Sequence, residues 1–260
     1  CIEAYGEQPS SRPSPKGEGD LSLVSLRELL GVIGAHEWRR RGIEVAALDA
    51  NVHPHYGVFA PIRSEYVDLV AEAPLPGALD AFPIAFDIGT GTGVIAAVLA
   101  RRGIPRVVAT DIDARALACA RENIASLGLA AQVDVTRADL FPEGRAALAV
   151  CNPPWVPARP SSPLEHGIYD PESRMLRGFL AALAAHLVPG GEGWLILSDL
   201  AEHLGLRSRG ALLAWFAEAG LEVRGRMEAR PRHPRASDAS DRLHAARKAE
   251  RTSLWRLAAR

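Results

Sequence analysis

The chain has 260 residues, of which 48% are hydrophobic and 23% charged, and its formal net charge is -1. This size suits one large α/β domain with additions, or at most two small domains. No apolar run approaches the roughly 18 to 20 residues of a membrane span, so a cytoplasmic protein without membrane contacts is expected. Three cysteines without CxxC spacing predict neither a disulfide framework nor a zinc site. Because the sequence begins at Cys1 and not at methionine, we expect a truncated or processed product.

The N-terminal part contains two kinds of segment. Residues 1–20 are rich in Pro, Ser, Gly and charge, and are expected to be disordered. From Leu21, apolar residues recur at helical spacing, which predicts a helix to about Arg41 behind a cap at Asp20 or Ser22. IEVAALDA is then expected to be a strand, NVHPHYG a turn, and VFAPIRSEYVDLV a short strand leading into a helix. These two strands predict a hairpin ahead of the main domain, which divides the chain into segments 1–20, 21–57 and 58–260.

Strands and helices alternate in the main domain. Such alternation predicts a Rossmann-like parallel sheet with helices on both faces. Asp170 is a candidate cap for one helix with Pro171 in its first turn, and Pro189-Gly190-Gly191 is expected to end that segment. The strands are expected near residues 83–88, 106–111, 132–136, 146–151 and 193–198, and the helices near 92–102, 114–127, 171–187 and 208–219.

The C-terminal part departs from this alternation. LEVRGRMEARP and TSLWRLAA look like strands, and no crossover helix of standard size lies between them. They predict that a sheet of seven strands ends in an antiparallel pair. The segment between them, RHPRASDASDRLHAARKAE, is expected to be a polar insertion with a short helix.

A glycine loop follows the first strand of the main domain. The stretch AFDIGTGTGVIAAVLA runs from a strand through Gly89, Gly91 and Gly93 into a helix. Glycines let the backbone turn sharply and approach a ligand closely, and a helix N-terminus offers free N–H groups. The dinucleotide fingerprint is GxGxxG, whereas these glycines fall as GxGxG, with Val94 in the place of the last one.

Carboxylates follow the next two strands. Asp111 ends the second strand, where a carboxylate can accept two hydrogen bonds from ribose hydroxyls. Asp113 is more simply a helix cap. After the third strand, Asp139 is placed to accept from an adenine amino group, and Leu140 to supply backbone and apolar contacts. Ligands of open α/β sheets bind at the carboxyl ends of the strands, so these positions together predict a nucleotide-like site.

With FDIGTGTG, TDID, ADLF and CNPPW in this order, the chain resembles the class I S-adenosylmethionine-dependent methyltransferases over residues 58–260. The resemblance implies S-adenosyl-L-methionine as cofactor. It places residues of four loops around that cofactor. These are Asp87, Gly89, Thr90, Gly91 and Gly93 at the methionine half, Asp111 and Ile112 at the ribose, Asp139 and Leu140 at the adenine, and Asn152 beside them.

The NPPW motif suits chemistry on a planar nitrogen. An amide or exocyclic amino nitrogen is a poor nucleophile because its lone pair is delocalised. Two acceptors, the Asn152 side-chain oxygen and the Pro153 carbonyl, can take both N–H bonds and expose that lone pair to the methyl group. Pro153 and Pro154 keep the carbonyl rigid. Trp155 is expected to stack on the flat target, which is worth about 1 to 3 kcal/mol.

Two further segments point to one substrate class. FAPIRSEYVDLV and the stretch LEHGIYDPESRMLRGFLAALAAHLVPGG resemble the release-factor glutamine methyltransferases. The main hypothesis is therefore methylation of a glutamine amide in a release-factor-like protein. An exocyclic amine of ribosomal RNA, transfer RNA or DNA is the alternative. By the same resemblance Arg63 and Glu65 either border the active site or form a surface salt bridge.

Other function classes and sequence features have less support than the methyltransferase hypothesis. A nicotinamide-dependent oxidoreductase would share the glycine loop, and a non-catalytic binding protein would share the fold. Turn chemistry explains His53 and His55 better than a metal site, and Cys151 is expected to be a buried strand residue. Residues 221–260 contain eleven Arg or Lys against five Asp or Glu, so this segment is expected to face nucleic acid, a ribosome-bound partner or solvent. The sequence indicates no oligomeric state.

Overall fold

A sheet of seven strands runs through the molecule in the order β5-β4-β3-β6-β7-β9-β8. The computed structural model describes residues 26–158, 169–232 and 244–260. The first five strands in this order are parallel, and β9 runs antiparallel to both neighbours. The Rossmann-like sheet with an antiparallel C-terminal pair is therefore confirmed. Its strands are β3 (Ile84–Ile88), β4 (Arg106–Asp111), β5 (Val133–Arg137), β6 (Ala146–Cys151), β7 (Leu187–Ser198), β8 (Leu221–Ala229) and β9 (Thr252–Ala259).

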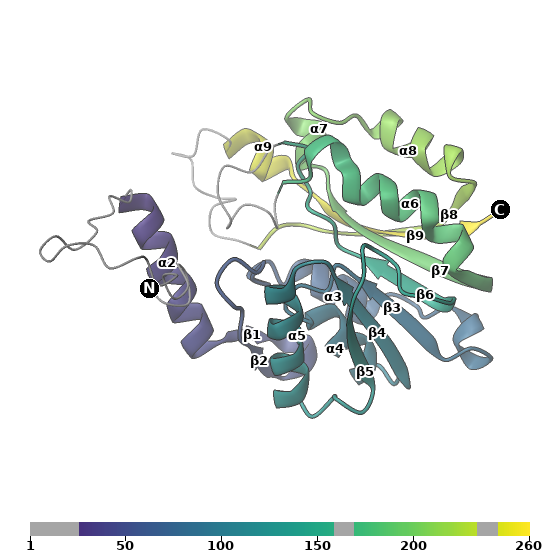
Figure 1. The fold of residues 1–260 in the computed structure, drawn as a ribbon. Helices are drawn as coiled ribbons and strands as arrows, with labels where there is room; N and C mark the ends of the chain where they lie inside the picture. Colours follow the sequence, from purple (N-terminus) through teal and green to yellow (C-terminus); the bar gives the residue numbers. More distant parts are fainter. Residues whose placement is uncertain (1–25, 159–168, 233–243) are drawn as a thin grey trace, which may run out of the picture.

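Helices cover both faces of the sheet (Figure 1). One layer holds α3 (Glu65–Glu72), α4 (Val94–Arg101) and α5 (Ala114–Ser126), and the other holds α6 (Arg174–His186) and α8 (Arg209–Glu218). The helix α4 is apolar on all sides, because it is enclosed by the sheet, α3 and α5, and its first seven residues are all buried. Two short helices, α7 (Leu200–His203) and α9 (His244–Ala249), lie near the start of β9.

The N-terminal region differs in part from its prediction. The helix α2 (Leu26–Arg41) is confirmed and extends away from the sheet in Figure 1. The proposed caps and the segment 1–20 lie outside the described residues. The predicted pairing of the hairpin is wrong, since β1 (Ile43–Val45) and β2 (Ala50–Val52) both fall within residues 43–52. The short strand predicted at the start of VFAPIRSEYVDLV does not form, and residues 58–64 lead into α3 without a strand. The prediction of one strand over IEVAALDA is wrong because Asp49, with φ of 49°, turns the chain back in the left-handed region that Asp tolerates.

The segment around α6 also corrects one boundary. Asp170 does cap this helix, because its carboxylate accepts from the backbone N–H groups of Met175 and Leu176 at 3.0 and 3.1 Å. The helix ends at His186, however, and Pro189-Gly190-Gly191 lies inside β7. The prediction that this tripeptide ends the helical segment is wrong, since β7 begins directly after α6 and an irregular register with β6 accommodates the turn-forming residues.

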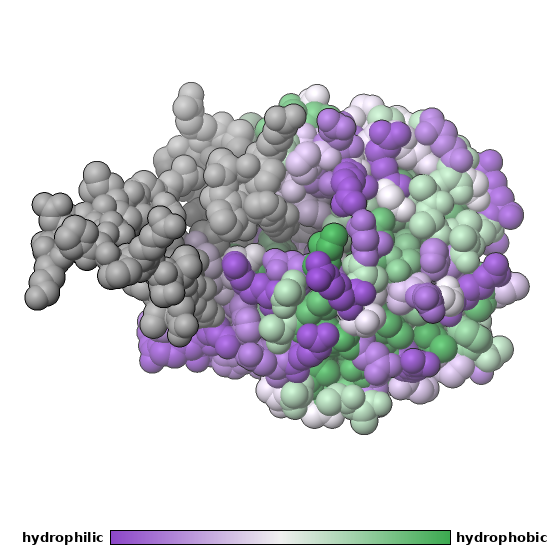
Figure 2. Space-filling model, viewed as in Figure 1, coloured by the Kyte–Doolittle hydropathy of each residue, from purple (hydrophilic) through white to green (hydrophobic). Residues whose placement is uncertain are grey.

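The core of the domain lies along the middle strands of the sheet. The strand β6, between β3 and β7, is buried along its whole length. Figure 2 shows polar and apolar residues intermixed on the viewed face, with hydrophobic ones gathered low in its middle, near β5. Among the helices that the structure describes, none is long and apolar enough to cross a membrane. The division of the chain at residues 57 and 58 stays a prediction.

Candidate active site

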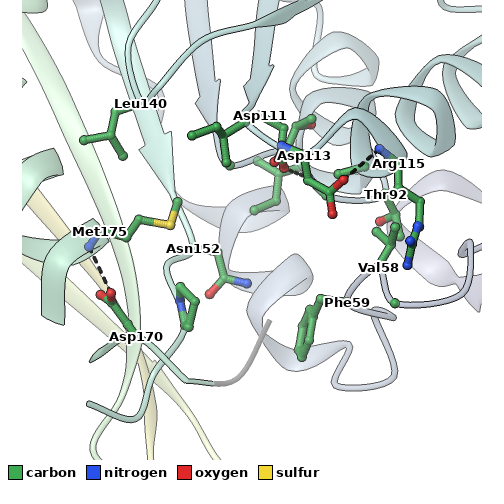
Figure 3. Close-up of a pocket in the computed structure, with 18 of the residues that line it drawn as sticks. Val58, Phe59, Thr92, Asp111, Asp113, Arg115, Leu140, Asn152, Asp170 and Met175 are labelled. Carbon is green, nitrogen blue, oxygen red and sulfur yellow. Dashed lines mark hydrogen bonds between the residues drawn. The ribbon is translucent and has the colours of Figure 1, made fainter. Parts of the chain in front are cut away.

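A cavity of about 510 Å³ opens where β3, β4, β5 and β6 end, a size typical of small-ligand sites (Figure 3). Residues from four separate loops therefore share one site, as the sequence predicts. Four predicted residues are not among the described residues that line the cavity: Asp87, which lies within β3, and the loop residues Gly93, Pro153 and Trp155. The predicted residues that do line it are Gly89, Thr90, Gly91, Asp111, Ile112, Asp139, Leu140, Asn152 and Pro154.

The glycine loop is held by backbone hydrogen bonds to β4. Gly89 and Thr90 both donate their N–H groups to the Thr110 carbonyl, at 2.9 and 2.8 Å. Gly91 has φ of 55°, and a Cβ atom there would meet only Val58, at 4.0 Å. Its missing side chain thus leaves room on the cavity side of the loop.

Gly93 serves a different purpose from Gly91. Its φ is 82°, and a Cβ atom there would lie 3.3 Å from Ala120 in α5. This glycine therefore allows α4 and α5 to pack closely and does not border the cavity. The implied place of Gly93 beside the methionine half stays a prediction.

Asp87 organises the loop from beneath. The Thr90 hydroxyl and the Ala96 N–H both donate to its Oδ2, at 2.6 and 3.0 Å. Its Oδ1 is buried and has no hydrogen-bond partner among the described residues. Burial raises the pKa of Asp87 to about 7, because its effect is larger than the opposite effect of the Thr90 hydrogen bond, which lowers this pKa. An unsatisfied buried acceptor at this point suits a donor brought by a ligand.

Asp111 faces the cavity and also ties the loops together. One of its oxygens accepts from the Gly91 N–H and the other from the Asp113 N–H, both at 3.0 Å. Burial raises the pKa of Asp111 above its usual value. The capping role of Asp113 is confirmed, because its carboxylate accepts from the Arg115 N–H at 2.8 Å at the start of α5.

The loop after β5 carries Asp139 and Leu140. Asp139 is exposed and one of its oxygens accepts from Arg174 at 2.9 Å, so part of its hydrogen-bonding capacity is already used. Leu140 has φ of 73°, a conformation that costs an L-residue about 1 to 2 kcal/mol. Its carbonyl accepts from the Thr110 hydroxyl at 2.6 Å, which holds this strained loop against the cavity.

The NPPW motif places Asn152 in the cavity and Trp155 behind it. In Figure 3 the Asn152 side chain lies between Met175 and Phe59. The Trp155 ring is only 8% exposed, and its indole N–H donates to Asn152 Oδ1 at 2.8 Å. The guanidinium of Arg63 lies 4.7 Å from the ring centroid. Burial and the Arg63 contact thus place Trp155 outside the described lining of the cavity, which argues against the predicted stacking on the target.

The ion pair of Arg63 is buried rather than superficial. Arg63 donates to Glu65 and to Glu250, each at 2.8 Å, and these carboxylates are 1% and 2% exposed. The surface salt-bridge interpretation of Arg63 and Glu65 is wrong. Both residues lie behind the NPPW loop and are not among the described residues that line the cavity. Pro153 is buried as well, and the acceptor role of its carbonyl stays a prediction.

Residues 50–216 match the family described as Methyltransferase small domain. The chain belongs to this family. The matched range contains the glycine loop, Asp111, Asp139 and the NPPW motif. It is therefore a methyltransferase-family domain whose cavity lies within the family's matched region.

Several relatives are similar over part of the chain. A release factor glutamine methyltransferase of Cereibacter sphaeroides is 37% identical over 155 residues, which are 57% of this chain and 52% of the relative. A ribosomal protein L11 methyltransferase of Chelativorans sp. is 37% identical over 119 residues, 46% of this chain and 36% of the relative. A ribosomal RNA small subunit methyltransferase C of Mannheimia succiniciproducens is 34% identical over 107 residues, 41% and 29% of the two chains. The chain spans about half the length of the release-factor relatives that it matches.

Solved structures support the fold. A methyltransferase from Pyrococcus furiosus has a TM-score of 0.52 at 17% identity and covers 90% of this chain and 99% of its own. A ribosomal protein L11 methylase from Lactobacillus delbrueckii subsp. bulgaricus has a TM-score of 0.51 at 18% identity, covering 82% and 87%. At this identity the likeness shows the fold alone.

Some cavity residues were absent from the sequence prediction. Val58 and Phe59 precede α3, and Tyr169 and Met175 flank the start of α6. They carry no polar motif, so the only available signal was their position in the two segments that resemble release-factor enzymes.

The two histidines, Cys151 and several charges of the basic segment make contacts within the fold. His53 and His55 contact different partners, the Arg39 carbonyl and Glu122, which fits the turn interpretation. Cys151 is fully buried in β6, and burial raises the pKa of its thiol. In the basic segment 221–260, Arg256 pairs with Glu192 at 2.6 Å and Arg232 with Asp68 at 2.8 Å. Several of its charges are thus used within the fold.

Proposed function

We propose that the chain is an S-adenosylmethionine-dependent N-methyltransferase that acts on a planar nitrogen. One observation carries this proposal. Asn152, at the end of β6, shares a single cavity with Gly91 and Asp111, at the ends of β3 and β4. A cofactor-binding half and a half suited to an amide or exocyclic amine therefore meet in one space.

The described residues fit the cofactor. The open side of Gly91 admits a ligand next to the backbone, and Asp111 presents a partly buried carboxylate toward ribose hydroxyls. The unpartnered Asp87 Oδ1 suits the amino group of the methionine part. Ile112 is 54% exposed and lines the cavity, which suits contact with a flat apolar base. When bound, S-adenosylmethionine supplies a methyl group attached to a positively charged sulfur.

The protein's contribution is to hold the nitrogen. The second lone pair of Asn152 Oδ1 accepts one N–H of the target, and the Pro153 carbonyl accepts the other. Both bonds draw the nitrogen toward a tetrahedral shape in which its lone pair points at the methyl group. No strong base is needed, because the proton can leave after the methyl group has been transferred. Most of the rate then comes from alignment of the reacting atoms.

For the substrate we propose a glutamine amide in a release-factor-like protein. The support is similarity, since three release factor glutamine methyltransferases are 35% to 37% identical over 155 to 159 residues. The cavity is also lined by the aromatic residues Phe59 and Tyr169. A ribosomal RNA amine is the second candidate, because the relative from Mannheimia succiniciproducens is named for that activity.

The test uses the purified protein and methyl-labelled cofactor. Intact release factor, ribosomal protein L11 and ribosomal RNA are offered separately, and the Asn152→Ala protein is the control. We expect label in release factor that alkaline hydrolysis liberates as methylamine, the product of an N-methylated amide. Label in ribosomal RNA alone would favour the second candidate. No cofactor binding by calorimetry at millimolar concentration would refute methyl transfer altogether.

A further inference from the structure

A hydrogen bond joins the two polar ends of the NPPW motif. The Trp155 indole N–H donates to Asn152 Oδ1 at 2.8 Å. An indole nitrogen only donates, so the atom of the Asn152 amide that faces it must be the oxygen. This contact therefore fixes which end of the amide is which, and it limits rotation of the side chain.

The Trp155 residue is itself held from two sides. Arg63 lies 4.7 Å above its ring, and the buried Arg207 approaches its carbonyl at 3.5 Å. A ring that is 8% exposed and covered by a guanidinium has little freedom to turn. Asn152 is thus hydrogen-bonded to a residue that is immobile in its own right.

Arg63, which covers the Trp155 ring, is held by ion pairs to two distant parts of the chain. Arg63 is paired with Glu65 at the start of α3 and with Glu250 after α9, each at 2.8 Å. Glu250 also accepts from the Ser198 hydroxyl at the end of β7. Charges buried to this degree are costly unless they are paired, so the Arg63 ion pairs constrain its position, although Arg63 Nη2 and Glu65 Oε2 have no hydrogen-bond partner among the described residues. The ion pairs with Glu65 and Glu250 fix the position of Arg63, and Arg63 in turn restricts the Trp155 ring that it covers.

We propose that Trp155 is a positioning residue that orients Asn152 for the transfer, and that it does not stack on the substrate. The inference rests on the proposed function and names a further residue for it. Its indole N–H takes one lone pair of Oδ1 and leaves the other directed toward the target. The flat target then packs against residues that line the cavity, among which Phe59, Tyr66 and Tyr169 are aromatic.

The decisive variant replaces Trp155 with 3-benzothienylalanine, introduced at this codon by suppression. This analogue keeps the two rings but has sulfur in place of the N–H group, so packing and the Arg63 contact persist while the donor is lost. The control carries the same analogue at Trp215 in α8, whose ring is likewise covered by an arginine, Arg177, at 5.4 Å.

We expect kcat of the Trp155 analogue to fall about 10- to 100-fold, as misplacement of a positioned group does, with unchanged affinity for S-adenosylmethionine and an unchanged melting temperature. The Trp215 analogue should keep full kcat. Unchanged or faster turnover of the Trp155 analogue would overturn the inference. A parent protein that transfers no methyl group to any offered substrate would instead overturn the proposed function.

Nuclear magnetic resonance gives a readout that needs no substrate. The five tryptophans yield five indole N–H signals, and Trp155→Phe identifies the one from Trp155. In Asn152→Ala this signal should move upfield and exchange with solvent faster, while the other four stay in place. If neither the chemical shift nor the exchange rate of the Trp155 indole signal changes in Asn152→Ala, the hydrogen bond is absent in solution.

Discussion

The two halves of the cavity are built by different physical means. The glycine-loop half uses backbone: Gly89 and Thr90 are tied to β4, and the Asp111 carboxylate fastens Gly91. The NPPW half uses side chains, with Asn152 held by Trp155 and Trp155 covered by an ion pair buried behind the loop. A backbone cradle tolerates small shifts of a bound cofactor, whereas a reacting nitrogen must be aligned closely with the methyl group. Under the proposed function, side-chain contacts therefore hold the half of the cavity where alignment matters more.

The largest effect is expected from breaking the buried network. Arg63→Ala leaves two carboxylates that are 1% and 2% exposed without their cation, and should lower the free energy of unfolding by about 3 to 5 kcal/mol. Arg106→Ala removes a cation from a surface pair whose side chains are each 61% exposed, and should cost less than about 1 kcal/mol. Urea unfolding of both variants measures the contrast. Equal losses of unfolding free energy would show that the buried ion pairs of Arg63 contribute no more to stability than a surface pair does.

The next effect separates catalysis from cofactor binding. Asn152→Ala removes an acceptor that acts on the target, and should lower kcat about 100- to 1,000-fold, as loss of one polarising group does. Affinity for S-adenosylmethionine by calorimetry should be nearly unchanged. Asn152→Asp keeps an oxygen for both Trp155 and the target, so it should retain more activity than the alanine variant. Normal turnover of Asn152→Ala would remove the proposed nitrogen-holding role.

The glycine-loop half should show the opposite pattern. Asp111→Ala loses hydrogen bonds to a charged group worth about 1.5 to 3 kcal/mol, so cofactor affinity should fall about 10- to 100-fold. At saturating cofactor kcat should recover. Asp113→Ala loses a helix cap, which costs about 1 kcal/mol of stability, and should leave affinity almost intact. If both variants bind the cofactor equally well, Asp111 is not its ribose acceptor.

The same division explains what the sequence could predict. Glycines, strand-end carboxylates and the order of strands are local signals, so Asp111, Asn152 and the seven-stranded sheet were recoverable from sequence. The role of Trp155 was not, because it depends on Arg63, ninety-two positions earlier, and on Glu250, ninety-five positions later. Gly91 and Gly93 look alike in the motif, yet only packing against Ala120 separates their roles. Likewise the left-handed turn at Asp49 was hidden within an apolar run that looked like one strand.

The last prediction concerns the proton on Asp87. Burial raises its pKa to about 7, from an ordinary value of 3.8, so the folded protein keeps this proton after the unfolded chain has lost it. The unfolded state then binds fewer protons between about pH 4 and 7, and the contribution of Asp87 to stability declines as pH rises, by at most about 1.4 kcal/mol per pH unit.

The neutral variant Asp87→Asn lacks this pH-dependent contribution to the free energy of unfolding. The difference in unfolding free energy between the parent and the variant should therefore change in the variant's favour from pH 5 to pH 7, and level off above that. Saturating S-adenosylmethionine should reduce the slope in the parent, because an amino group bound near Oδ1 favours the charged carboxylate. Parallel curves without cofactor would mean that Asp87 is ionised throughout. Parallel responses to cofactor would mean that the amino group binds elsewhere, and that the backbone of the glycine loop alone recognises the methionine half.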